Sequence, residues 1–126
     1  LAIIDKRRTG HNMAESLTVI GDVSGRTAVL IDDMIDTGGT ICAGARLLRQ
    51  QGANRVLACA THAVFSPPAS ERLSADGLFE QVVVTNSIPI QQERMFPQLH
   101  VLSVANMLGE AILRIHEESS VSSMFR

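Results

Sequence analysis

The chain has 126 residues, of which 45% are hydrophobic, and a formal net charge of −2. A chain of this length can bury one ordinary core, and nothing in it indicates a second domain. The charge balance gives no electrostatic footprint for nucleic acid or an anionic membrane, and no apolar run approaches the ~20 residues of a transmembrane helix. We therefore expect one soluble domain without nucleic-acid or membrane partners.

The first segments of the chain are an apolar stretch and a basic one. Residues 1–4 are apolar from the start, which we interpret as part of a strand in a fragment of a longer protein. Residues 5–12 read as a polar loop with three cations, Lys6, Arg7 and Arg8. Such a charge run is ordinarily a solvated face, but a loop at the end of a strand can also close over a polyphosphate. A strand is expected at residues 17–20, followed by a turn at 21–26 between two adjacent strands.

The most informative stretch is V-L-I-D-D-M-I-D-T-G-G-T, from Val29 to Thr40. Residues 27–31 are short, β-branched and apolar without alternation, which is typical of a strand buried on both faces of a parallel sheet. A turn of small residues follows, then a helix expected at residues 40–51 and ended by Gly52. In α/β sheets ligands bind at the carboxyl ends of the strands, where the first N–H groups of a helix can hold an anion.

The turn contains the residue types of a phosphate-binding loop, which are Asp36, Thr37, Gly38, Gly39 and Thr40. Glycines allow close backbone approach, and hydroxyls donate to phosphate oxygens. Asp32 and Asp33 would repel a phosphate at contact distance, so the ligand should carry hydroxyls or a metal ion a few ångströms away, as a sugar phosphate does. The stretch fits neither the Walker pattern nor G-x-G-x-x-G, and a turn without any ligand is the alternative.

Downstream, the pattern predicts strands at residues 55–61, 81–85 and 99–101, a short helix at 69–75 and an amphipathic helix at 104–118. Cys42 and Cys59 have no C-x-x-C spacing and read as buried free thiols of a reducing cytosol. His62 follows a strand at the expected ligand edge. Because no carboxylate or second histidine lies at ligand spacing, a structural role for His62 is the simpler interpretation.

D-D-M-I-D-T-G-G-T after an apolar strand resembles the ribose-5-phosphate loop of ribose-phosphate pyrophosphokinases, also called phosphoribosyl pyrophosphate (PRPP) synthetases. T-H-A-V-F-S at residues 61–66, N-S-I-P at 86–89 and the ending E-S-S-V-S-S-M-F at 118–125 resemble further segments of that family, although Ala63 replaces its usual glycine. The resemblance covers the whole chain but only the carboxyl-terminal part of a family member. It implies a doubly wound α/β fold with a mostly parallel sheet, like that of the type I phosphoribosyltransferases.

The resemblance also implies a reaction and roles in it. The β,γ-diphosphoryl group of ATP moves to the C1 hydroxyl of ribose 5-phosphate, giving PRPP and AMP with Mg²⁺ as cofactor. The loop from Asp36 to Thr40 would hold the 5-phosphate, and Asp32 and Asp33 would face the ribose hydroxyls and a metal ion. Lys6 and Arg8 would stabilise charge on the transferred group.

Further expectations from the resemblance concern partners and regulation. Ser120, Ser122 and Phe125 would belong to an allosteric nucleotide and phosphate site at a subunit interface. The enzyme would be a cytoplasmic homo-oligomer, a hexamer in the family, whose amino-terminal half supplies most of the ATP site. The chain alone should bind ribose 5-phosphate, turn over slowly or not at all, and expose an apolar patch around residues 1–4. A PRPP-consuming type I phosphoribosyltransferase and a non-catalytic regulatory subunit are the alternatives.

Overall fold

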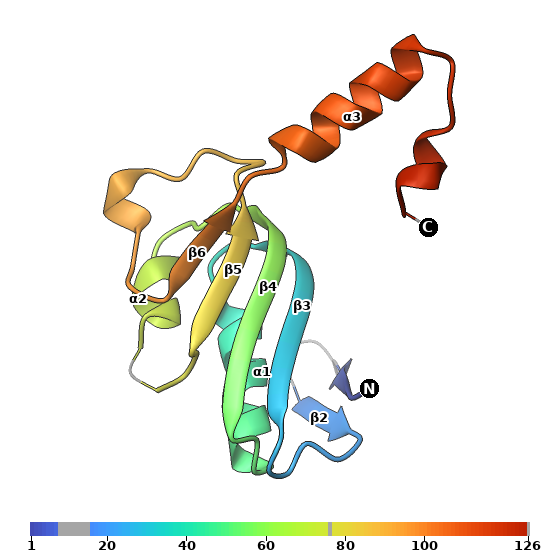
Figure 1. Ribbon diagram of the computed structural model, residues 1–126. Coiled ribbons are helices and arrows are strands. Elements are labelled where there is room, and N and C mark those ends of the chain that lie inside the picture. Colours follow the sequence, from blue (N-terminus) through green and yellow to red (C-terminus); the bar gives the residue numbers. More distant parts are fainter. Residues whose placement is uncertain (8–15, 76, 126) are drawn as a thin grey trace.

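The computed structural model describes residues 1–7, 16–75 and 77–125, with the backbone alone given for residues 5–7, 16 and 17. Two strands, β1 (Ile3–Arg7) and β2 (Ser16–Ile20), form an antiparallel pair. A parallel sheet follows in the order β3-β4-β5-β6 (Figure 1). Its strands are β3 (Thr27–Ile35), β4 (Arg55–Ala63), β5 (Gln81–Thr85) and β6 (Leu99–Leu102). The predicted α/β class with a mostly parallel sheet is confirmed.

The described helices connect or follow these strands. They are α1 (Gly39–Gln50), α2 (Ala69–Leu73), the short 3-10 helix η1 (Gln92–Arg94), α3 (Ala105–His116) and the 3-10 helix η2 (Val121–Phe125). α1 joins β3 to β4, with Gln51 as its C-cap, and is followed by Gly52, which has a φ of 88°. A positive φ costs glycine little, so the chain can turn back toward β4 there. None of the described helices is long and apolar enough to cross a membrane.

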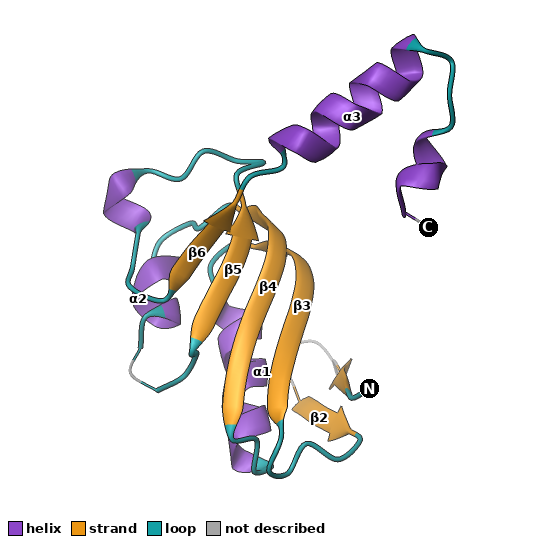
Figure 2. Ribbon diagram, in the orientation of Figure 1, coloured by secondary structure: helices purple, strands orange, loops and turns teal. Residues whose placement is uncertain are grey.

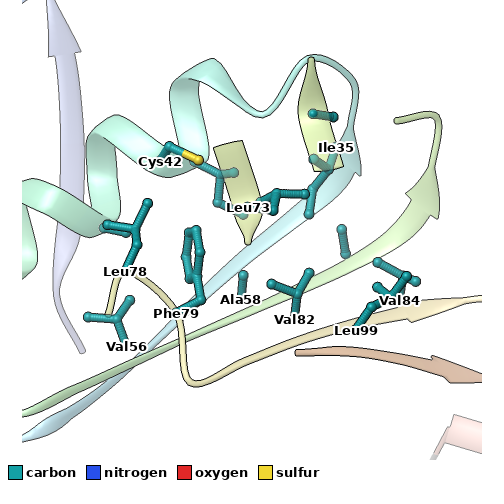
Figure 3. Packing of buried hydrophobic residues seen from close by; sticks show 14 of the residues in the cluster. Ile35, Cys42, Val56, Ala58, Leu73, Leu78, Phe79, Val82, Val84 and Leu99 are labelled. Carbon is teal, nitrogen blue, oxygen red and sulfur yellow. The ribbon is translucent and has the colours of Figure 1, made fainter. Parts of the chain in front are cut away.

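The hydrophobic core lies between the sheet and one helical layer. α1 and α2 cover the same face of the sheet (Figure 2). Alternate residues of the central strands point into this layer, so Val56, Ala58 and Val82 are completely buried, as are Ala45 of α1 and Leu73 of α2. Figure 3 shows these strand residues facing the helices, with Phe79 and Leu78 closing one end of the cluster.

The other face of the sheet is open. Val29 is 51% exposed and Ile31 is 81% exposed, so the expectation that this strand is buried on both faces is wrong for the described residues. Both crossover helices lie on one side, and α3 leads away from the sheet instead of folding onto it (Figure 1). Cys59, which pairs with Ile31 in the sheet, is therefore only half-buried, whereas Cys42 is buried.

Two strands are longer than the apolar pattern indicated. β3 continues through the acidic pair to Ile35, and β4 continues to Ala63. The parallel ladder between them extends from the Thr27–Arg55 pair to the Ile35–Ala63 pair. Backbone pairing does not require apolar side chains, so Asp32, Asp33 and His62 lie within strands and not after them.

The amino-terminal region also differs from the expectation. Residues 5–7 belong to β1 instead of a loop, and Lys6 pairs with Leu17 of β2. Because β2 pairs with β1, the segment 21–26 joins two sheets and does not join adjacent strands. Arg8 lies outside the described residues. Antiparallel pairing of the backbones explains why a polar segment is extended here.

Candidate functional site

The site lies between the end of β3 and the start of α1. β3 delivers residues 36–40, the DTGGT loop, to the carboxyl edge of the parallel sheet. Gly38 adopts left-handed backbone angles, with φ of 73° and ψ of 0°, immediately before the first residue of α1. A side chain at this position would be strained, so glycine lets the chain turn from strand to helix within a few residues.

The start of α1 presents backbone N–H groups. Its first helical hydrogen bond runs from the Cys42 N–H to the Gly38 carbonyl, 3.0 Å away. Within the part of the chain that the structure describes, no side chain caps the helix at Gly38. The N–H groups of Gly39, Thr40 and Ile41 therefore have no helical acceptor, and with the helix dipole they form a place suited to an anion.

A cavity of about 270 Å³ adjoins this loop. Its lining consists of Asp32, Met34 and residues 35–41. The whole predicted loop and one of the two predicted aspartates therefore share a cavity. Asp33, the next residue along β3, does not line this cavity.

The two aspartates also bond to their own strand. Asp32 accepts from the Asp33 N–H at 2.9 Å, and Asp33 accepts from the Met34 N–H at 2.8 Å. Each contact uses one lone pair of Oδ1, so both carboxylates keep acceptor capacity for a ligand hydroxyl or a cation. Among the described residues, no group of three or more His, Cys, Asp or Glu side chains could hold a metal ion.

His62 sits near the same edge and has a polar partner. Its Nδ1 lies 2.9 Å from Ser87 Oγ, and the Ser87 hydroxyl donates to the Thr61 carbonyl at 3.0 Å. Because serine has a single hydroxyl proton, the histidine Nδ1–H must be the donor to Ser87. His62 thus ties the end of β4 to the turn after β5, in keeping with the structural interpretation.

The other predicted residues belong to the first strand or to the tail, or lie outside the described residues. The Lys6 backbone is part of β1, whereas Arg8 is not among the described residues. The tail forms η2 at the far end of α3 (Figure 1), where Ser120 Oγ and Ser122 Oγ are 2.9 Å apart and Phe125 is exposed. Arg114 donates to the Ser120 carbonyl at 3.2 Å, so the tail is folded back toward α3.

Sequence reasoning missed one residue beside the loop. Arg72 of α2 donates from Nη1 to the Thr37 carbonyl, 3.0 Å away. Arg72 is separated from Thr37 by a helix and a strand along the chain. No local pattern around the D-T-G-G-T segment predicts this contact, because it depends on the packing of α2 behind the loop.

Together, the parallel sheet and the loop define an α/β domain with a glycine-rich turn at the carboxyl end of its first parallel strand. The family model described as "Phosphoribosyl synthetase-associated domain" matches residues 8–126. The chain therefore belongs to the phosphoribosyl synthetase-associated domain family.

Individual relatives agree with this assignment. The chain is 94% identical over its whole length to a ribose-phosphate pyrophosphokinase of Parasynechococcus marenigrum (strain WH8102), of which it covers 38%. It is 64% identical, again over its whole length, to ribose-phosphate pyrophosphokinase 1 of Spinacia oleracea, of which it covers 37%. The crystal structure of phosphoribosylpyrophosphate synthetase from Mycobacterium smegmatis matches 94% of this chain and 37% of that one, with a TM-score of 0.83 and 47% identity. The chain thus spans less than half the length of these relatives.

Proposed function

We propose that this chain is the ribose-5-phosphate-binding, carboxyl-terminal part of a ribose-phosphate pyrophosphokinase. The complete enzyme transfers the diphosphoryl group of ATP to the C1 hydroxyl of ribose 5-phosphate and releases PRPP and AMP. The observation that carries the proposal is the cavity that contains the whole DTGGT loop together with Asp32. Loop N–H groups and a nearby carboxylate suit a ligand that carries a phosphate and hydroxyls on one small framework.

In this proposal the loop from Asp36 to Thr40 holds the 5-phosphate through backbone N–H groups and hydroxyls. Asp32 and Asp33 accept from the ribose hydroxyls through their carboxylate oxygens. Lys6 and Arg8 act on the transferred diphosphoryl group, because phosphoryl transfer depends mainly on positioned positive charge.

The residues present fit Mg²⁺ as part of a ligand set. Mg²⁺ is commonly held by one or two carboxylates together with substrate phosphates and water, and Asp32 and Asp33 can supply the carboxylates. When bound, the ion would neutralise charge on the phosphates. The two free cysteines suit the reducing cytoplasm that we propose as the location. The amino-terminal half of the enzyme is the proposed partner that supplies most of the ATP site, in a homo-oligomer.

Calorimetric titration tests the binding part of the proposal. The chain should bind ribose 5-phosphate and should bind ribose, which lacks the phosphate, far more weakly, because the loop acts on the phosphate. If the chain binds the two sugars equally well, or binds neither of them, the assignment of the loop to the phosphate is contradicted.

An assay of the full-length protein tests the reaction. ATP and ribose 5-phosphate should give AMP and PRPP. Consumption of PRPP with a nucleobase would instead identify a phosphoribosyltransferase. Binding of ribose 5-phosphate without turnover in the full-length protein would favour a regulatory subunit.

A further inference from the structure

The DTGGT loop is supported from behind by α2. A Cβ atom built on Gly38 would lie 3.6 Å from Leu73 Cγ and 3.7 Å from Ala69 Cα, and both of these α2 residues are fully buried. The Cys42 thiol of α1 also lies 3.6 Å from the Arg72 carbonyl. One side of the loop is therefore closed by packed side chains, and a ligand approaches from the cavity side.

Arg72 makes a directional contact with this supported loop. Its Nη1 donates to the Thr37 carbonyl at 3.0 Å, and a Cβ atom on Gly39 would lie 3.5 Å from the same nitrogen. In a trans peptide unit the carbonyl and the following N–H point in opposite directions. Holding the Thr37 carbonyl toward α2 therefore turns the Gly38 N–H away from Arg72.

The charge of Arg72 also reaches the first turn of α1. Burial raises the pKa of the Cys42 thiol, and the positive charges of Arg46 and Arg72 act in the opposite direction. The guanidinium stays charged at every physiological pH. An anion held by the N–H groups of this turn would be attracted by the same positive charge.

We propose that Arg72 is a positioning residue for the phosphate of the ligand, because it fixes the direction of the Thr37–Gly38 peptide and places a permanent positive charge behind the DTGGT loop. The inference rests on the proposed function, since it assigns this residue to the ribose-5-phosphate site. Arg72 acts through the loop and needs no contact with the substrate.

The test compares two arginine variants in the full-length enzyme that carries this chain. Arg72→Met removes the bond and the charge, and should raise KM for ribose 5-phosphate about tenfold, as expected for a lost hydrogen bond to a charged group. KM for ATP and the Tm should change little. Arg46→Met is the matched control, because Arg46 also lowers the pKa of Cys42 through its charge but, among the described residues, makes no hydrogen bond to the loop. Arg72→Lys keeps a charged donor and should recover part of the affinity.

Each outcome decides between interpretations. Equal effects of Arg72→Met and Arg46→Met would overturn the positioning role and leave only a general charge effect. A lowered Tm, a matched loss for both substrates and no recovery with Arg72→Lys would also overturn it, because they indicate a purely structural residue. Failure of the unaltered enzyme to use ribose 5-phosphate would instead contradict the proposed function, independently of Arg72.

Discussion

At the scale of single residues, the two adjacent glycines of the DTGGT loop are required for different reasons. Gly38 has a positive φ, which a side chain would strain. A Cβ atom on Gly39 would meet only ordinary contacts, at 3.5 Å to Arg72 Nη1 and 3.8 Å to Thr37 Oγ1. The fold therefore tolerates a side chain at Gly39, but such a side chain would block the close approach of the proposed phosphate to the backbone.

Gly39→Val should weaken ribose 5-phosphate binding by about tenfold or more while leaving the fold intact, because a branched side chain would stand where backbone approaches phosphate. Calorimetric titration of the variant measures this loss. Gly109→Val is the control, since Gly109 lies in α3 with open space around it. Unchanged affinity for Gly39→Val would contradict the phosphate role of the loop.

A second residue-scale feature is the exposed ion pair between Arg55 and Glu80. The hydrogen bond from Arg55 holds the pKa of the Glu80 carboxyl below its ordinary value of 4.5. A lowered pKa in the folded state means that the pair stabilises the fold above the ordinary pKa and loses this effect as the pH falls through the lowered one.

Glu80→Gln should therefore lower the Tm slightly at about pH 7, and this difference from the unaltered chain should vanish toward about pH 3. Thermal unfolding followed by circular dichroism across this range measures the difference. If the difference stays constant over the whole range, the pair does not contribute in the manner described.

At the scale of elements, α2 is short but links the core to the DTGGT loop. Leu73 is fully buried and lies against Gly38, and Arg72 next to it bonds to Thr37. A helix of this length has little stability of its own. Its position therefore depends on side-chain packing, and the loop depends on its position.

Leu73→Ala should lower the free energy of unfolding of the chain by about 2–5 kcal/mol, as large-to-small core substitutions do. Urea denaturation of the dilute isolated chain measures it. Leu113→Ala is the matched control, because Leu113 is 48% exposed on α3 and should change the free energy by much less. Equal effects of the two substitutions would contradict the packing role of α2.

β1 is a second element with a proposed role, because Lys6 is its second-to-last residue. In the full-length enzyme, Lys6→Ala should lower kcat far more than it raises KM for ribose 5-phosphate, because its charge is needed mainly in the transition state. Steady-state kinetics separate the two, with Arg26→Ala as a control for a lost surface charge. Comparable losses in binding and in turnover would identify a ground-state phosphate clamp instead.

At the scale of the whole molecule, two apolar surfaces of the described residues lie uncovered besides the patch that was expected at the start of the chain. One is the open face of the sheet, with Val29 and Ile31, and the other is α3, where Ile112 and Ile115 are each 67% exposed. The expected patch at residues 1–4 is present too, with Ile3 56% exposed. Large exposed apolar patches normally mark interfaces.

The isolated chain should therefore self-associate in light scattering, and Ile31→Ser should reduce the association because Ile31, at 81%, is the most exposed large hydrophobic residue described in the parallel sheet. Added amino-terminal half of the enzyme should bind the chain and restore ATP-dependent PRPP formation. If the chain is monomeric and does not bind the added half, the domain is self-sufficient.

The sequence by itself determined the DTGGT loop and most of the elements, but not the full length of β1, β3 and β4. Periodicity, β-branched runs and glycine positions placed the strands and helices, and the compact D-T-G-G-T segment needed only its neighbours to define a strand-to-helix turn. The resemblance then indicated the family that the comparisons confirmed. These features are local, because backbone preferences and a short motif are written in consecutive residues.

Only the tertiary structure decided what depends on distant contacts. Backbone pairing with β4 places Asp32 and Asp33 within β3. α3 leads away from the sheet (Figure 1), and Ile31 is exposed on the open face. Arg72 donates to the Thr37 carbonyl, although α1 and β4 lie between the two residues in the sequence. Strand pairing and helix packing join residues that no local pattern relates, so these positions could not be predicted from the sequence.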